Sequence, residues 1–194
     1  MSVLTTTERA RALVDKAVED FCSDFNSGRV SPILEADVSA YLYHRIVGNG
    51  CPTNMVYLAT RVCGEAARSR KPDIVIGTLS KREACVSPLL ICELKVFQRW
   101  GHSDQQMRHR FSGLLAEDLP SLSEASSALT VGRLEIIADL FVSAQRRGYL
   151  AGTWDGQNRK EMVATKCREI GAALLWVHPR CDSDDIISEV VVEW

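Results

Sequence analysis

Apolar residues recur with the 3.6-residue period of an amphipathic helix near the beginning of the chain, up to Gly28. The threonine-rich stretch at 5–8 supplies a capping-box start for this helix. Ser31 as N-cap, with Pro32 at the first helical position, predicts a second helix that ends near Gly48. The apolar face of the first helix consists of Leu13, Val14, Ala17, Val18, Phe21 and Phe25.

Strand-like runs follow the second helix. Three of them are rich in branched apolar residues and are separated by polar or Gly/Pro-containing turns, and their order indicates a meander. They cover 55–63, 73–79 and 87–97. The rest of the chain predicts helices over 103–116, 131–147 and 157–170, a polar loop over 117–127, a buried strand over 172–178 and an edge strand over 186–194.

Length and composition fit a single α/β domain, because 194 residues with 46% hydrophobic types can bury a full core. We expect an N-terminal packing helix over 1–30, a motif-bearing core over 31–110, and C-terminal elements over 111–194 that complete the sheet. No stretch has the roughly 18 to 20 apolar residues that a membrane-spanning helix needs, and the N-terminus has helical rather than signal-peptide character. A cytoplasmic protein with no membrane partner is therefore expected.

Charge and cysteine content further limit the classes of protein to which the chain can belong. The formal net charge of −2 argues against a protein that coats nucleic acid through bulk positive charge, so any such contact must come from local patches. The seven cysteines are scattered and form no Cys-x-x-Cys pair, so neither a zinc knuckle nor a disulfide framework is predicted. Reduced thiols are expected.

The strand predicted over 87–97 contains the candidate chemistry. From Leu89 to Phe97 it is a nearly continuous apolar run interrupted by Glu93 and Lys95, which predicts a strand covered on both faces. Charges buried there need partners, a metal ion or a water-lined cleft, because an isolated buried charge is costly. Side chains alternate along a strand, so Glu93 and Lys95 point to the same face and one cleft can receive both.

Two more carboxylates can join this cleft. Asp73 lies at the mouth of the preceding apolar strand, which is expected to pair with the strand of Glu93. Glu35 shares the inward stripe of the second helix, although Glu65, after the first strand, is an alternative to it. Neighbouring carboxylates raise one another's pKa unless a divalent cation neutralises them, and oxygen ligands suit Mg²⁺ or Mn²⁺. The backbone carbonyl of Leu94 can add another oxygen.

Pro72-Asp73 and, 20 residues further on, Glu93-Leu94-Lys95 resemble the motif of the PD-(D/E)xK nuclease superfamily. Each pattern occurs once in the chain, and Glu35 occupies the place of that family's helix glutamate. The resemblance covers about residues 31–110 and implies a restriction-endonuclease-like αβββαβ core, in which a central mixed sheet is flanked by helices. It also implies that the three carboxylates bind Mg²⁺, for which Mn²⁺ can substitute, and that Lys95 positions or activates the attacking water.

Residues on either side of the motif could bind the phosphates of a nucleic acid. Gln105 and Gln106 lie at the start of the helix predicted over 103–116, and family members often use a glutamine near the phosphate. However, Ser103 and Gln106 also form a potential capping box, which would leave Gln105 as the freer side chain. The basic candidates, for which solvated surface charge is an equally good explanation, are Arg99, Arg108, Arg110, Arg68, Arg70 and Lys71.

These residues favour a Mg²⁺-dependent nuclease that hydrolyses phosphodiester bonds in DNA. An RNA endonuclease is an alternative, because the metal site acts on the phosphate and does not by itself select the sugar. A second alternative is a catalytically silent nuclease-like module that binds nucleic acid or a partner protein, and a third is a structural α/β domain in which Lys95 only pairs with Glu93. A homodimer is compatible with double-strand cutting, but no residue marks an interface.

Overall fold

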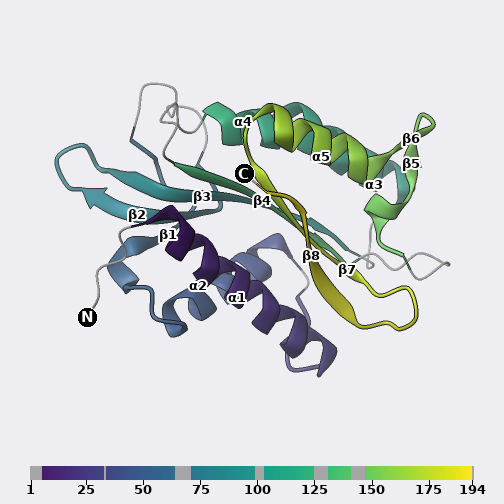
Figure 1. Cartoon of the computed structure of the whole chain (residues 1–194), viewed down its shortest axis with the longest axis horizontal. Helices are drawn as coiled ribbons and strands as arrows, with labels where there is room; N and C mark the ends of the chain where they lie inside the picture. Colours follow the sequence, from purple (N-terminus) through teal and green to yellow (C-terminus); the bar gives the residue numbers. More distant parts are fainter. Residues whose placement is uncertain are drawn as a thin grey trace.

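The structure, a computed structural model, describes residues 6–32, 34–63, 71–98, 103–124, 131–140 and 147–193. These residues form an α/β protein around a mixed six-stranded sheet with the strand order β1-β2-β3-β4-β7-β8 (Figure 1). The strands of the sheet are β1 (Val56–Leu58), β2 (Ile74–Ser80), β3 (Cys85–Phe97), β4 (Gly132–Asp139), β7 (Ala173–Pro179) and β8 (Ile186–Val192). A separate hairpin pairs β5 (Thr153–Trp154) with β6 (Gln157–Asn158).

Helices cover both faces of the sheet (Figure 1). One face is covered by α1 (Thr7–Asn26) and α2 (Glu35–Gly48), and the other by α3 (Asp104–Gly113), α4 (Leu119–Glu124) and α5 (Arg159–Glu169). Short helical turns are η1 (Thr53–Met55), η3 (Leu114–Asp118) and η4 (Tyr149–Ala151). Within the described ranges, every helix is too short or too polar to span a bilayer.

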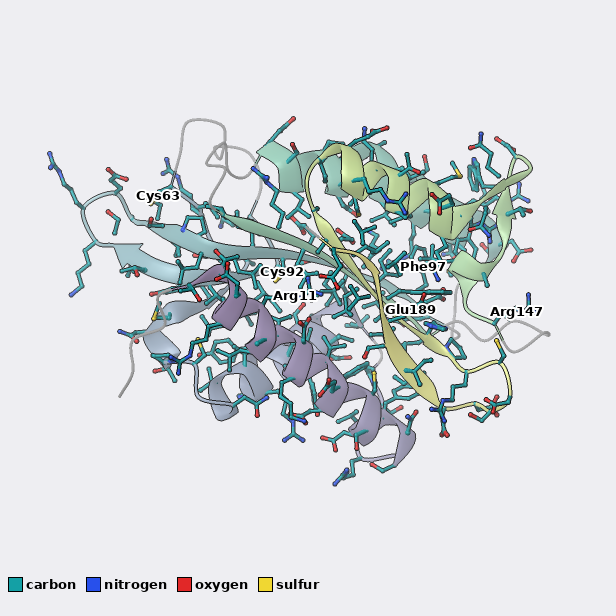
Figure 2. The ribbon with its side chains drawn as sticks, in the orientation of Figure 1. Arg11, Cys63, Cys92, Phe97, Arg147 and Glu189 are labelled. Atoms are coloured by element: carbon teal, nitrogen blue, oxygen red, sulfur yellow. A yellow bond between two sulfur atoms is a disulfide. The ribbon has the colours of Figure 1, made fainter. Side chains whose placement is uncertain are left out.

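Alternate residues of β3 enter two separate hydrophobic cores. Cys92 and Leu94 pack with α1 and α2 in the first core, whereas Ile91 and Phe97 pack with α3 to α5 in the second. Figure 2 labels Cys92 and Phe97 in these two layers. The prediction that this strand is covered on both faces is therefore confirmed.

The two neighbours of β3 pair with different parts of it, and this difference positions the candidate site. The antiparallel pairing of β2 with β3 reaches Ile74↔Cys92 and stops there, whereas the parallel pairing of β3 with β4 continues to Phe97↔Asp139. Residues 93–97 of β3 therefore have a partner strand on the β4 side but, within the described chain, no strand on the β2 side. We call this segment the free edge of β3.

Two predictions for the second half of the chain are wrong. The helix expected over 131–147 is replaced, over 132–139, by the strand β4, which lies parallel to β3 and β7. A parallel strand buried on both faces has a continuous apolar run without strict alternation, and such a run also fits a helical period. The loop expected over 117–127 is helical up to Glu124, through the π-helical turn η3 and α4.

Other boundaries shift by a few residues. The helix expected to begin after Ser31 begins at Glu35, and the Asp37 side chain accepts a hydrogen bond from the Leu34 N–H at 2.8 Å at this new start. The strand expected over 55–63 is shorter, because Ala59 adopts a left-handed φ of 44° directly after β1. The remaining helices and strands lie where the sequence predicts them, within a few residues.

The expectation of reduced thiols is wrong for one pair of cysteines. Cys63 and Cys85 form a disulfide, close to the isolated bridge between Val62 and Val86. The backbone N–H of Cys63 also donates to the carbonyl of Val86 at 2.9 Å. The pairing depends on how this segment lies against β3, which spacing alone does not encode. The cysteines that stay free are Cys22, Cys51, Cys92, Cys167 and Cys181.

Candidate active site

Asp73 lies directly before β2, beside the free edge of β3. Its Oδ2 accepts a hydrogen bond from the Leu94 N–H at 2.8 Å, and the carboxyl of Glu93 is close enough to share a hydrogen bond with it. Burial raises the pKa of Asp73, the hydrogen bonds to Leu94 and Glu93 oppose that rise, and the charge of Asp118 adds to it. The two carboxyl groups that the sequence predicts to be neighbours thus lie together.

Glu35 reaches the same edge from the first turn of α2. Its Oε2 accepts hydrogen bonds from the Val96 N–H at 3.1 Å and from Arg110 Nη2 at 3.0 Å, and Arg110 also donates to the Val96 carbonyl at 2.9 Å. Burial raises the pKa of Glu35, while the charge of Lys95 and the Val96 N–H oppose this effect. Arg110, a phosphate-binding candidate from the sequence, is engaged with Glu35 instead.

Lys95 forms an ion pair with Asp118, with 2.6 Å between Nζ and Oδ2. The Lys95 side chain is only 16% exposed, so this contact lies largely out of water. Asp118 is the last residue of η3, a π-helical turn, and such turns are frequent at functional sites. The sequence pattern does not indicate Asp118, because it falls in a stretch with the composition of a polar loop.

One pocket of about 430 Å³ brings these groups together. Leu94 contributes its backbone: its N–H points toward Asp73, and the carbonyl of a strand residue points to the same side as its N–H. The Leu94 carbonyl therefore faces the free edge, on the same side as Asp73. The pocket is lined by Glu35, Lys71, Asp73, Glu93, Leu94, Lys95 and Asp118.

A carboxylate that the sequence pattern does not predict lies next to Glu93. Glu135 on β4 is the in-register partner of Glu93 and is 0% exposed. Neither of its carboxylate oxygens has a hydrogen-bond partner among the described residues. Burial raises the pKa of Glu135 well above its ordinary value, the nearby charges of Glu93 and Asp118 add to the rise, and Lys95 opposes it.

Of the described nucleic-acid-binding candidates, Lys71 lines the pocket, whereas those on α3 do not. Gln105, Gln106 and Arg108 are exposed on α3 and do not line it. Gln106 and Ser103 form the capping box, in which Gln106 Oε1 accepts from the Ser103 N–H at 2.7 Å and Ser103 Oγ accepts from the Gln106 N–H at 3.3 Å. Gln106 is thus committed to the helix start. The candidates Arg68, Arg70 and Arg99, and the alternative carboxylate Glu65, lie outside the described residues.

The potential metal-ligand atoms of the pocket are carboxylate and carbonyl oxygens, which suit a hard divalent cation better than a soft metal. Among the described residues, the set of three potential ligand atoms within 4.8 Å of one another belongs to Cys63, Glu83 and Cys85. Two of those atoms are the sulfurs of the disulfide, so they are not free thiolates. The pocket carboxylates form a looser set, with Glu35 held by Arg110.

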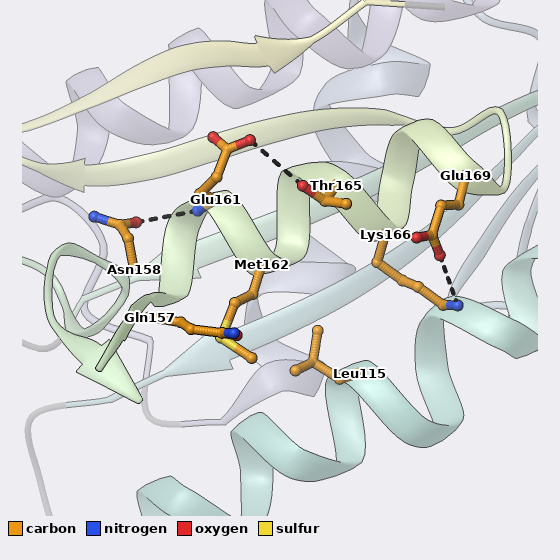
Figure 3. Close-up of a pocket in the computed structure, with 8 residues that line it drawn as sticks. All are labelled: Leu115, Gln157, Asn158, Glu161, Met162, Thr165, Lys166 and Glu169. Carbon is orange, nitrogen blue, oxygen red and sulfur yellow. Dashed lines mark hydrogen bonds and ion pairs between the residues drawn. The ribbon is translucent and has the colours of Figure 1, made fainter. Parts of the chain in front are cut away.

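A larger pocket, of about 640 Å³, lies along α5 (Figure 3). The apolar side chains of Leu115 and Met162 contribute to its lining, and several polar groups are paired with one another. Lys166 Nζ lies 3.0 Å from Glu169 Oε2, for example (Figure 3). The charged groups of the smaller pocket are buried and interact with one another, so we place the candidate active site there.

The chain has no match among protein-family models, curated proteins or solved structures. Its function must therefore be inferred from the residues of the pocket and from their arrangement.

Proposed function

We propose that this chain is a Mg²⁺-dependent nuclease that hydrolyses phosphodiester bonds in DNA. The observation that supports the proposal best is the arrangement at the free edge of β3, where Asp73, Glu93 and the Leu94 carbonyl lie beside the ammonium group of Lys95. Oxygen ligands beside one positively charged side chain can bind a divalent ion and a phosphate at the same time.

The fold is consistent with the resemblance to the PD-(D/E)xK superfamily. The order α2-β1-β2-β3-α3-β4 follows the αβββαβ order of a restriction-endonuclease-like core, with the motif residues before β2 and within β3. Glu35 on α2 also reaches the backbone of β3 at Val96, as a helix glutamate of such a site should. We therefore propose that the core of this protein is restriction-endonuclease-like.

The residues present fit a divalent cation. Asp73, Glu93 and Glu135 are crowded carboxylates whose mutual repulsion a cation would relieve, and Glu135 is buried with both oxygens lacking a partner among the described residues. Mg²⁺, or Mn²⁺ in its place, would be held by Asp73, Glu93 and the Leu94 carbonyl, with Glu35 as a further ligand. A bound cation of this kind polarises the phosphate and acidifies water.

The side chains themselves have separable roles in this proposal. Lys95 would orient the attacking water and offset the charge that develops on the phosphate, because its ammonium group lies inside the pocket. Asp118 holds that ammonium group at 2.6 Å. Lys71, which also lines the pocket, would contact a phosphate of the substrate.

Cleavage assays with purified protein test the proposal. Linear, circular, single-stranded and branched DNA, and RNA of the same sequence, are incubated with Mg²⁺ or Mn²⁺ beside Asp73→Ala and Lys95→Ala. Each variant should lose at least about a thousandfold in rate, equivalent to roughly 4 kcal/mol of transition-state stabilisation. Lys160→Ala is a matched control, because Lys160 forms a similar ion pair with Glu189, at 2.8 Å, remote from the pocket. Unchanged cleavage by the two folded pocket variants would reject the proposal.

A catalytically silent module that binds nucleic acid or a partner protein is the second candidate function. The pairing of Glu35 with Arg110 favours it, since a guanidinium group there already neutralises one of the proposed ligands. Calorimetric titration with Mg²⁺ separates the two functions. Absence of Mg²⁺ binding would favour the silent module. The RNA arm of the assay decides between a deoxyribonuclease and an RNA endonuclease.

A further inference from the structure

Glu135 lies outside the sequence motif, and neither of its carboxylate oxygens has a hydrogen-bond partner in the described chain. It lies in the interior of β4, in register with Glu93 on the parallel neighbour β3. Ile91 and Ile137, two residues along each strand, both belong to the core under α3 to α5. Because side chains two residues apart on a strand share a face, Glu93 and Glu135 point to the same side of the sheet.

The spacing of the two strands suits a shared ion. Neighbouring strands lie about 4.8 Å apart, and a divalent cation binds carboxylate oxygens at about 2.0–2.5 Å. An ion between two in-register carboxylates can therefore contact both without a change in the backbone.

The charges around Glu135 are mostly of its own sign. The carboxylates of Glu93, Asp118 and Asp73 all act on it, and Lys95 is the positive charge that opposes them. Lys95 is itself engaged by Asp118 at 2.6 Å. A buried carboxylate in such surroundings is stable only if it takes up a proton or if a cation joins the group, since desolvation and repulsion both disfavour the bare anion.

We propose that Glu135 is a further ligand of the site, whose carboxylate binds a divalent cation together with Glu93. This inference rests on the proposed function in one respect, namely that the pocket at the free edge of β3 holds such a cation. It adds to that function a ligand on β4, one strand further into the sheet than the residues of the motif. If Glu135 instead remained a neutral, protonated side chain, it would fill its space without affecting cation affinity.

Titration of the cation-stripped protein with Mn²⁺, followed by calorimetry, tests the inference without any substrate. Glu135→Gln has nearly the same shape and should lower the affinity at least about tenfold, as is typical when a group that supports a metal site is removed. Glu135→Asp, which keeps the charge on a shorter side chain, should recover part of the affinity. The control Glu161→Gln, at an exposed carboxylate on the surface of α5, should stay within about twofold of the wild-type affinity.

The outcomes distinguish this inference from the proposed function. Affinity of Glu135→Gln within twofold of wild type, or no binding of Mn²⁺ to the wild-type protein, would overturn the inference. If the Glu135→Gln affinity falls and no nucleic acid is cleaved, the ligand is supported and the nuclease is rejected. If cleavage occurs and the affinity is unchanged, the nuclease stands and the ligand is rejected. Should Glu135→Gln fail to fold, Glu135→Asp and a Mn²⁺-soaked crystal, with anomalous density beside Glu135 expected, decide the matter.

Discussion

Strand β4 carries two buried carboxylates, Glu135 and Asp139, whose surroundings differ strongly. They are four residues apart, so both side chains point to the same face of the sheet. Asp139 accepts hydrogen bonds from the Tyr149 N–H at 2.6 Å, the Leu150 N–H at 2.7 Å and Trp176 Nε1 at 3.3 Å. Glu135 has no such donor among the described residues. Both side chains are 0% exposed, so burial alone does not distinguish them.

The comparison separates a carboxylate that belongs to the fold from one that is available to a ligand. The charge of Asp139 is satisfied by protein N–H groups, and the chain packs so closely around it that a Cβ at Gly148 would lie 2.3 Å from its Oδ2. Glu135, in contrast, lies among charges of its own sign beside the pocket. Donors from the protein make a buried charge structural, and their absence leaves it to be neutralised by a proton or an ion.

The largest difference between the two residues should appear in stability. Asp139→Ala leaves two backbone N–H groups and the Trp176 indole N–H without their acceptor, and should lower the free energy of unfolding by about 3 kcal/mol or more. Glu135→Gln removes no hydrogen bond with a described residue and should leave cation-free stability unchanged or slightly raised. Urea denaturation followed by circular dichroism measures both. A comparable loss in the two variants would show that Glu135 is structural as well.

A smaller effect should appear in the pH dependence of stability without divalent cations. Burial and neighbouring carboxylates raise the folded-state pKa of Glu135, so its proton is bound more tightly in the folded protein than in the unfolded chain. The stability this contributes is fully present below the unfolded pKa of about 4.3 and is lost as the pH rises through the raised folded value. Stability should thus fall as the pH rises above the unfolded value, and Glu135→Gln should reduce the slope.

Carboxylates with lowered pKa values provide the contrast for this experiment. Asp24 is one of them, because hydrogen bonds from Tyr41 and Arg45 favour its charged form. Its contribution is present above its unfolded pKa and is lost as the pH falls below about 4, outside the window assigned to Glu135. A fall in stability at rising pH that is the same in wild type and Glu135→Gln would show that Glu135 is not the source of the effect.

The sequence identifies the part of the site on β3 more readily than the part on β4. Glu93 and Lys95 stand out because a strand with apolar residues on both faces seldom contains charges. Glu135 and Asp139 interrupt an apolar run in the same way. However, that run also fits a helical period, and on a helix neither carboxylate is expected to be buried among apolar residues on both sides. Recognition of residues 132–139 as a buried parallel strand would have indicated both carboxylates.

Other parts of the site depend on tertiary packing that the pattern does not contain. Asp118 reaches Lys95 because η3 is a π-helical turn, a local widening that residue composition does not reveal. The pairing of Arg110 with Glu35 spans 75 residues of sequence and depends on how α2 and α3 meet the end of β3. Glu35 itself was predictable, since its place on the inward stripe of its helix needs only the helical period.

Glu35 shares features with both carboxylates of β4. Like Glu135 it is a proposed ligand, and like Asp139 it is already paired with a protein group. Arg110→Gln keeps a hydrogen-bond donor but removes the positive charge 3.0 Å from Glu35 Oε2. If Glu35 binds the cation, loss of this competing charge should raise Mn²⁺ affinity by about two- to fivefold, the size expected for a partly exposed ion pair. Arg108→Gln, on the exposed side of the same helix, serves as the control. Unchanged affinity with lowered stability would mean that Glu35, like Asp139, serves the fold by joining α2 to the free edge of β3.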